Sequence, residues 1–215
     1  MLRRIAVVVP AHDEEELLPA CLDALREATR HAPLPVDVLV VLDACTDDTA
    51  RVAAGFGVDT LTVSARNVGR ARAAGAAAVL ADDTWLACTD ADTRVTPDWF
   101  AQQLRLAGAG ADVVTGIVLV DDWGDWPEAT AVAFRDAYRE NLHAHVHGAN
   151  LGLSGVAYRR SGGFRPVAVA EDHALVRSAL EAGLRVARST EVRVFTSARR
   201  HARAPEGFSG FLRAL

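Results

Sequence analysis

The sequence has no lysine, few cysteines and no long apolar run. All 23 basic residues are arginine; a guanidinium suits phosphate, but we attribute so general a bias to genomic composition. The three cysteines show no C-x-x-C spacing and are odd in number, which favours a reduced, intracellular setting. The apolar run of residues 5–9 is too short for a signal peptide or a membrane-spanning helix. We therefore expect a cytoplasmic protein, with peripheral contact with a membrane left open.

The amounts of charge and apolar material are ordinary for a soluble globular protein. Of 215 residues, 50% are hydrophobic and 24% are charged, which is enough for one domain with its own core. The formal net charge of −5 disfavours nucleic acid and anionic membranes as partners. Arg199, Arg200 and Arg203 nevertheless crowd together near the C-terminus.

Apolar runs alternate with segments of helical spacing, which predicts an α/β fold with a doubly wound, mostly parallel sheet. Asp13 is expected to cap the first helix, and Thr46 or Asp47 the second. The expected strands are residues 5–9, 36–42, 60–63, 85–89, 111–120, part of 148–158, and 186–194. The expected helices are residues 14–30, 46–55, 67–81, 97–106, 129–142 and 171–182.

Carboxylates follow the strands at the positions where open α/β sheets bind ligands. Asp90 and Asp92 come directly after the strand at residues 85–89, and Asp43 follows the strand at 36–42. Taken alone, each acid is as well explained by a turn or a helix cap. Together they are expected to face one crevice, where two acids separated by one small residue suit Mg²⁺ or Mn²⁺.

Other candidate residues have both a functional and a purely structural explanation. Arg72 lies near the start of a helix and suits phosphate, but a solvated arginine is equally expected there. Asp172 follows Glu171 at the start of a later helix; it is either a general base or an acid stabilised by the helix dipole. The alternating His143, His145 and His147 are not expected to form a dedicated metal site.

Common phosphate-binding motifs are missing. No G-x-G-x-x-G follows the first strand, and no P-loop sequence is present, which disfavours dinucleotide-binding and kinase-like proteins.

Six motifs in order resemble those of the inverting glycosyltransferases of family 2, which have the A-type nucleotide-sugar fold. The resemblance covers about residues 5 to 200. It departs from the family pattern at Leu42, Ala44 and Cys45, and the second Asn of the N-x-G element is lost. The processive members' Q-x-x-R-W motif is absent, so a polymer synthase is not expected. The matching segments are Val9–Glu15, Val41–Thr49, Asn67–Gly75, Thr89–Asp92 with Thr96–Phe100, Gly148–Phe164, and Glu171–Val186.

The resemblance implies one domain, residues 1–215, that transfers a sugar from a UDP- or GDP-type donor. It implies a nucleotide-sugar half at about 1–95, an acceptor half at about 96–200 and a tail at 201–215. Asp172 would deprotonate the acceptor hydroxyl, Asp92 would bind Mg²⁺ or Mn²⁺, and His201 would complete the metal shell. The donor would be held by Pro10, His12, Glu14, Asp43, Arg72, Asp90 and Arg199.

The acceptor and the oligomeric state stay open. The acceptor is a small molecule, a lipid-linked group or a glycan, and its pocket is expected in the loops at residues 121–127 and 143–150. Two alternatives remain at this stage: a nucleotidyltransferase, and a nucleotide-sugar-binding module without catalysis. The sequence Ala11-His12-Asp13-Glu14 disfavours the first, because a nucleotidyltransferase usually has a Gly-rich, basic loop there.

Overall fold

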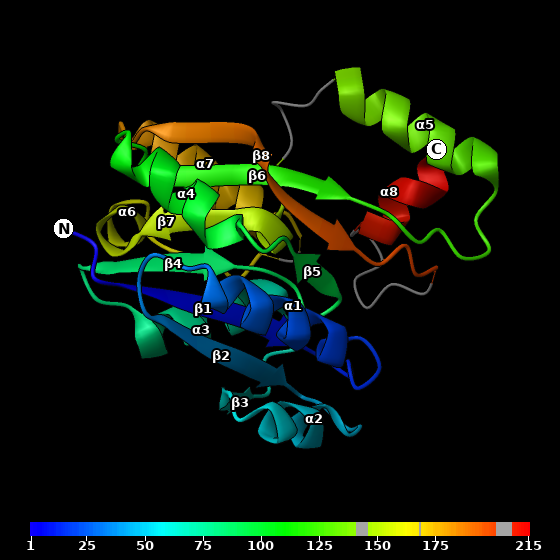
Figure 1. Ribbon diagram of the computed structural model, residues 1–215, viewed down its shortest axis with the longest axis horizontal. Coiled ribbons are helices and arrows are strands. Elements are labelled where there is room, and N and C mark those ends of the chain that lie inside the picture. The colour runs from blue at the N-terminus through cyan, green and yellow to red at the C-terminus, as the bar shows by residue number, and fades with distance from the viewer. Residues whose placement is uncertain (141–145, 168, 201–207) are drawn as a thin grey trace.

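A computed structural model describes residues 1–140, 146–167, 169–200 and 208–215, and one mixed sheet runs through it (Figure 1). The strand order is β3-β2-β1-β4-β7-β6-β8-β5. The strands are β1 (Arg4–Ala11), β2 (Val36–Asp43), β3 (Asp59–Val63), β4 (Thr84–Cys88), β5 (Thr93–Val95), β6 (Val113–Leu119), β7 (Leu151–Ser154) and β8 (Val186–Thr196). The helices are α1 (Leu18–Arg30), α2 (Thr49–Phe56), α3 (Val68–Val79), α4 (Trp99–Gly108), α5 (Glu128–Glu140), α6 (Gly155–Arg160), α7 (Glu171–Glu181) and α8 (Phe208–Ala214), with a 3₁₀ turn, η1 (Gly148–Asn150).

The predicted α/β class and the mostly parallel sheet are confirmed. Strands β1 to β4 pair in parallel, and β6 pairs in parallel with β8. The antiparallel pairs join β7 to β4 and β6, and β5 to β8. Residues 5–9 of β1 are fully buried, as expected for a strand covered on both faces.

Helices cover both faces of the sheet (Figure 1). α1, α2 and α4 share one apolar core with β1 and β4, and α3, α6 and α7 share a second core on the other face. On that second face α3 lies close to the sheet: a Cβ on Gly75 would come within 2.6 Å of Val8 and 2.8 Å of Val41. α5 and α8 form a smaller third cluster beyond the carboxyl end of β6. No described helix is long and apolar enough to cross a membrane.

Several local predictions were wrong. Asp13 does not cap α1, whose N-cap Leu17 makes no side-chain bond; instead Asp13 accepts a hydrogen bond from the Thr46 backbone. The N-cap of α2 is Asp48, not Thr46 or Asp47, although the Asp47 carboxylate does accept the Thr49 N–H. The strand expected within the Gly-rich segment 148–158 is present as β7; the segment ends in the unpredicted helix α6, whose N-cap Ser154 accepts the Ala157 N–H. The short elements β5 and α8 were not predicted.

Candidate functional site

The carboxyl ends of β1, β2 and β4 meet at one edge of the sheet. Val8 of β1 is in register with Cys88 of β4, and Ala11 is in register with Leu42 of β2. The residues that follow these strand ends are therefore neighbours, as the sequence predicts. They carry the acids Glu14, Asp43, Asp90 and Asp92.

Arg199 connects two of these acids. Its Nη1 and Nη2 donate to the two carboxylate oxygens of Glu14, each at 2.7 Å, and Nη2 lies 2.9 Å from Oδ2 of Asp92. The Glu14 and Asp92 side chains are only 7% and 15% exposed. The forked guanidinium fits this arrangement because two parallel N–H groups match one carboxylate.

The negative charge of the Asp92 carboxylate is disfavoured in the folded protein. Burial raises its pKa; Arg199 opposes this, and the carboxylates of Asp90 and Glu14 add to it, which leaves the pKa at about 6. Asp90 and Glu14 act on Asp92 electrostatically, and all three offer oxygen atoms, the ligand type that Mg²⁺ and Mn²⁺ prefer. Among the described residues, however, these three acids do not form a group whose ligand atoms lie within 4.8 Å of one another, so a metal ion at Asp92 stays a prediction.

Arg72 is buried, with 3% of its side chain exposed, and joins Asp90 to Glu171. Burial disfavours its charge, but Asp90 and Glu171 outweigh this and raise the pKa of Arg72. These pairs use both terminal nitrogens of Arg72. Arg72 therefore holds the two carboxylates in position, and a contact with phosphate stays a prediction. Gly148 and Phe164 lie against the guanidinium.

Asp172 stands on the first turn of α7, next to Glu171. Its Oδ2 accepts the backbone N–H of Gly148 at 2.7 Å, and Oδ1 accepts the N–H of His173 at 2.7 Å. Because Gly148 lies on Arg72 and Arg72 pairs with Asp90, this carboxylate is linked to the Asp90 region through two contacts. The candidate base and the candidate metal ligands thus belong to one region of the protein.

Asp43 is buried and organises the loop before α3. Its Oδ1 accepts the N–H groups of Ala65 and Arg66 at 2.7 and 2.9 Å, and Oδ2 accepts that of Asn67 at 3.0 Å. Its backbone oxygen lies 2.7 Å from Nδ1 of His12. A loop-holding role is therefore visible for Asp43, and a contact with a nucleotide base stays a prediction.

A second acidic group lies close to the strand ends, and its carboxylates already accept backbone hydrogen bonds. Ligand atoms of Asp13, Cys45 and Asp47 lie within 4.8 Å of one another. However, the Asp13 carboxylate accepts the Thr46 N–H at 2.6 Å, and Asp47 accepts the N–H groups of Thr49 and Glu15. Two of these bonds join the loop after β1 to the loop after β2, and the bond to Thr49 is local. These carboxylates therefore already have structural partners, and the metal position predicted at Asp92 is kept as the candidate.

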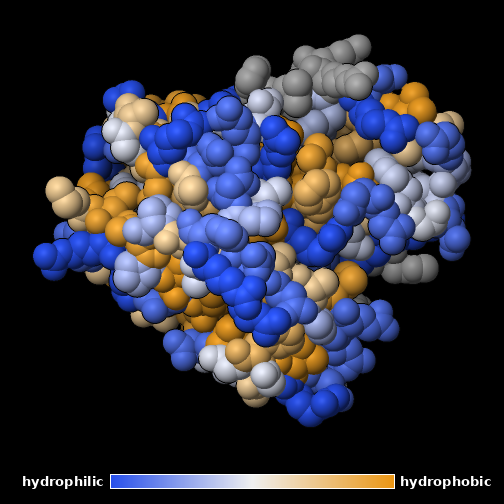
Figure 2. All heavy atoms as spheres, in the orientation of Figure 1, coloured by the Kyte–Doolittle hydropathy of each residue, from blue (hydrophilic) through white to orange (hydrophobic). Residues whose placement is uncertain are grey.

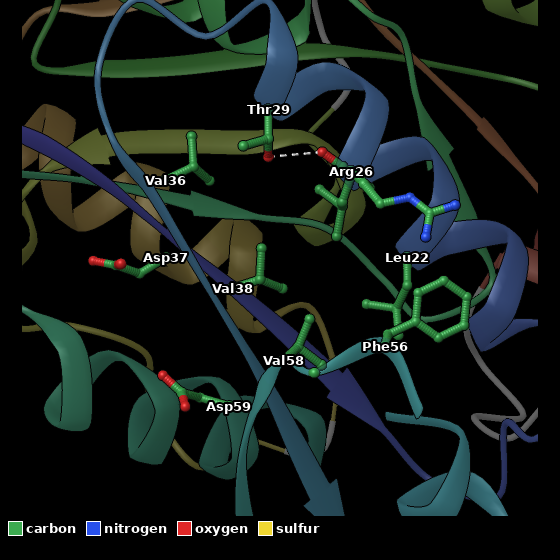
Figure 3. Close-up of a pocket in the computed structure, with 11 residues that line it drawn as sticks. Leu22, Arg26, Thr29, Val36, Asp37, Val38, Phe56, Val58 and Asp59 are labelled. Carbon is green, nitrogen blue, oxygen red and sulfur yellow. Dashed lines mark hydrogen bonds between the residues drawn. The ribbon is translucent and has the colours of Figure 1, made fainter. Parts of the chain in front are cut away.

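A shallow hollow of about 320 Å³ lies elsewhere on the molecule (Figure 3). Its lining includes Leu22 and Arg26 of α1, Val38 of β2, Phe56 of α2 and the nearby Val58. In Figure 2, residues coloured as hydrophobic lie over the part of the face where Figure 1 draws β2, β3 and α2. The hollow touches the start of β2 and β3, whereas the acids lie at the opposite ends of the strands.

Some predicted site residues are not placed by the structure. His201, His143 and His145 lie outside the described residues. His147 is described, and its Nε2 lies 3.2 Å from the Tyr138 hydroxyl. Pro10 is a half-buried residue of β1 that pairs in register with β2.

Sequence reasoning missed the structural partners of the site. Glu171 was noted only as a neighbour of Asp172, yet it is the buried partner of Arg72. Asn150 is fully buried; its amide accepts from Trp99 and donates to the backbone of Ile117 and Val192. An acid pair at a helix start and an Asn inside an apolar segment were the available signals.

Residues 6–162 match the family model described as Glycosyl transferase family 2. An uncharacterized glycosyltransferase of Mycobacterium tuberculosis is 37% identical over 113 residues, which are 52% of this chain and 47% of that protein. The undecaprenyl-phosphate 4-deoxy-4-formamido-L-arabinose transferase of Serratia proteamaculans is 26% identical over 138 residues, 58% of this chain and 40% of that protein. The chain thus spans less than half the length of these curated relatives.

Solved structures show the same fold at low sequence identity. Staphylococcus aureus TarS (residues 1–349) in complex with UDP-GlcNAc gives a TM-score of 0.73 at 12% identity, covering 95% of this chain and 61% of that one. The mannosyltransferase PcManGT of Pyrobaculum calidifontis in complex with GDP-Man and Mn²⁺ gives 0.69 at 20% identity, covering 94% and 59%. These likenesses extend the A-type glycosyltransferase fold over nearly the whole chain.

Proposed function

Because this chain belongs to glycosyltransferase family 2, we propose that it transfers a sugar from a nucleoside diphosphate sugar to an acceptor hydroxyl and inverts the anomeric centre. One observation carries the proposal: Glu14, Asp90 and Asp92 gather with Arg72 and Arg199 at the carboxyl edge of the sheet. Acids for a cation and arginines for phosphate are what a diphosphate leaving group requires.

The donor is proposed to be a UDP- or GDP-sugar. Two solved structures of similar fold are described in complex with UDP-GlcNAc, and with GDP-Man and Mn²⁺, which supports both bases. Pro10, His12 and Asp43 lie at the ends of β1 and β2, where the nucleoside would bind. Asp90 would contact the ribose or the donor sugar.

Asp92 is the proposed ligand of Mg²⁺ or Mn²⁺, with His201 as a further proposed ligand. A bound divalent cation supplies Lewis-acid stabilisation of the charge that develops on the departing diphosphate. Arg199 would add its own positive charge to the same oxygens. Arg72 would fix Asp90 against Glu171, so that the carboxylate keeps its orientation while the donor binds.

Asp172 is the proposed general base. It lies on the first turn of α7, in the proposed acceptor half, and its carboxylate accepts the Gly148 N–H at 2.7 Å. It would take the proton from the acceptor hydroxyl as that oxygen attacks the anomeric carbon. A single displacement opposite the leaving group inverts the configuration and forms no sugar–enzyme bond. The acceptor is proposed to enter beside residues 121–127 and 146–150.

A thermal-shift panel of UDP- and GDP-sugars with and without Mn²⁺ tests this function. A donor that binds only the folded state raises the melting temperature, and we expect this to require Mn²⁺. Hydrolysis of the stabilising donor without acceptor would then demonstrate catalysis. Release of pyrophosphate from a nucleoside triphosphate, or binding without any hydrolysis or transfer, would contradict the proposal.

A further inference from the structure

Arg199 occupies the side of Asp92 that faces Glu14. We propose that its guanidinium holds the cation's place in the donor-free protein and is exchanged for a divalent cation when a nucleoside diphosphate binds. The inference rests on the proposed metal-dependent function and adds an order of events to it: metal and nucleotide bind together, because each removes an obstacle to the other.

The first support is the use of the Asp92 oxygens. Oδ2 lies 2.9 Å from Arg199, and Oδ1 accepts a hydrogen bond from the Thr93 hydroxyl at 3.2 Å. Both oxygens therefore have a partner. Asp92 can bind a cation through Oδ2 only after Arg199 has left it, since two positive groups at one oxygen repel each other.

The second support is the anchoring of Arg199 on Glu14. Arg199 donates two hydrogen bonds of 2.7 Å to the Glu14 carboxylate, which is 7% exposed. Without Arg199, the negative charge of Glu14 would be buried without a partner. A metal ion at Asp92 would take over part of this compensation. Without a new anion for Arg199, however, the exchange leaves the guanidinium unpaired, so metal alone is a weak competitor.

The third support is that the backbone under Arg199 is held in place. The Ser197 N–H donates to the Asp92 backbone oxygen at 3.2 Å, and the Thr93 and Thr196 hydroxyls lie 2.9 Å apart. On the other side, the Trp126 indole donates to the Ala198 carbonyl. The exchange therefore requires a rotation of one long side chain, which is 26% exposed and so has access to solvent.

A diphosphate supplies what the metal alone lacks. Its oxygens offer Arg199 a new bidentate anion partner next to the acids it leaves. Binding of the diphosphate then favours binding of the cation and the reverse, which is a positive coupling of equal size in both directions. Arg199 adds to the coupling that the direct attraction between the cation and the diphosphate already gives.

Mn²⁺ titrations followed by electron paramagnetic resonance test the exchange, because they count free Mn²⁺ and need no turnover. For the natural protein, UDP or GDP should raise the Mn²⁺ affinity about tenfold or more, within the usual 5- to 150-fold range of such coupling. For Arg199→Ala, the affinity for Mn²⁺ alone should rise by about the same factor, and the nucleotide should then raise it less than in the natural protein, because only the direct attraction between cation and diphosphate remains. Arg199→Gln, which keeps an amide donor for Glu14, should behave in the same way if the alanine variant is unstable.

Arg200→Ala is the matched control. Arg200 carries the same charge one position away, but it lies over Trp126 and donates to the Asp125 carbonyl. It should leave the Mn²⁺ affinity and its dependence on nucleotide unchanged. Equal effects of the two variants would overturn the exchange in favour of a general charge effect. An unchanged or weaker Mn²⁺ affinity in both Arg199 variants would overturn it while leaving the proposed function intact, whereas a natural protein that binds no Mn²⁺ under any condition would overturn both.

Discussion

The guanidinium of Arg72 is paired with the carboxylate of Glu171, 99 positions later in the chain. Both side chains are almost fully buried, so the pair connects α3 and α7 inside the protein. It places the start of α7, and with it Asp172, at a fixed position relative to Asp90.

Replacing Arg72 by Met should destabilise the protein strongly. The change leaves Glu171 buried without its charge partner, a loss that costs about 3–5 kcal/mol. Urea denaturation at neutral pH measures it. The double variant Arg72→Met, Glu171→Gln removes both charges and should recover a large part of the loss. A double variant as unstable as the single one would show that packing, not charge compensation, is the role of Arg72.

The gathering of the candidate site residues at one edge of the sheet could be predicted from the sequence, because it follows from the order of strands. Buried runs such as residues 5–9 and 85–89 indicate parallel strands, and parallel strands bring their carboxyl ends to one edge. Asp90 and Asp92 could thus be placed near the end of β1 without coordinates. The same reasoning could not find the contact of Arg199 with Glu14, which are 185 positions apart.

The roles of individual side chains were less predictable than their location. The motif suggests that Asp43 binds a base, which stays a prediction; its visible role, accepting three backbone N–H groups of the loop before α3, could not be predicted. Arg72 has the sequence context of a solvated helix residue, and it is buried because Glu171 of α7, Gly148 and Phe164 pack around its guanidinium. Side-chain partners depend on tertiary packing, which residue spacing along the chain does not contain.

Replacing Asp92 by Asn should stabilise the metal-free protein at neutral pH. The pKa of Asp92 is about 6 in the folded protein against 3.8 for the ordinary group. The folded state therefore binds more protons than the unfolded state between about pH 4 and 6, and the natural protein loses stability as pH rises through this window. A difference of about 2 pH units corresponds to about 3 kcal/mol at most.

Denaturation curves in EDTA at pH 4 and pH 7 measure this effect. The stability of Asp92→Asn minus that of the natural protein should increase between the two pH values. Mn²⁺ with a nucleotide should then stabilise only the natural protein, because the variant has lost the proposed charged ligand. A difference that does not change with pH would show that the Asp92 carboxylate is not disfavoured in the folded protein.

Replacing Gly148 by Ala should disturb the site without changing any charge. A Cβ there would lie 2.5 Å from the guanidinium carbon of Arg72, which is buried and has little room to move. We expect a loss of about 1–3 kcal/mol in stability from this overpacking, together with weaker donor binding by calorimetry. Gly55→Ala is the control, because a Cβ on Gly55 meets nothing within 4 Å; it should be neutral or slightly stabilising. Equal melting temperatures for the two variants would contradict the close contact.

The three cysteines should differ sharply in reactivity. Cys21 and Cys88 are fully buried, and burial raises the pKa of both thiols, that of Cys88 to about 12. Cys45 is partly exposed, so an aromatic disulfide reagent at pH 8 should label it first. Cys45→Ser should remove this reaction, and all thiols should react after unfolding. Rapid labelling in the folded Cys45→Ser protein would mean that a buried region opens readily.

Replacing Asp172 by Asn should separate donor binding from transfer. The amide oxygen of Asn can still accept the Gly148 N–H, while the bond from the His173 N–H is lost. The affinity for donor should be kept, but the side chain can no longer take a proton. General-base catalysis contributes about 10²- to 10⁴-fold, and transfer should fall by a factor in this range. Calorimetry with the donor and Mn²⁺ measures the first property, and a coupled assay of released nucleotide measures the second. Glu181→Gln makes the same change of charge at the other end of α7, on an exposed residue far from the site, and should alter neither. If Asp172→Asn kept full transfer, the base would have to be sought among the other acids near Arg72, and Glu171, buried beside it with a raised pKa, would be the next to replace.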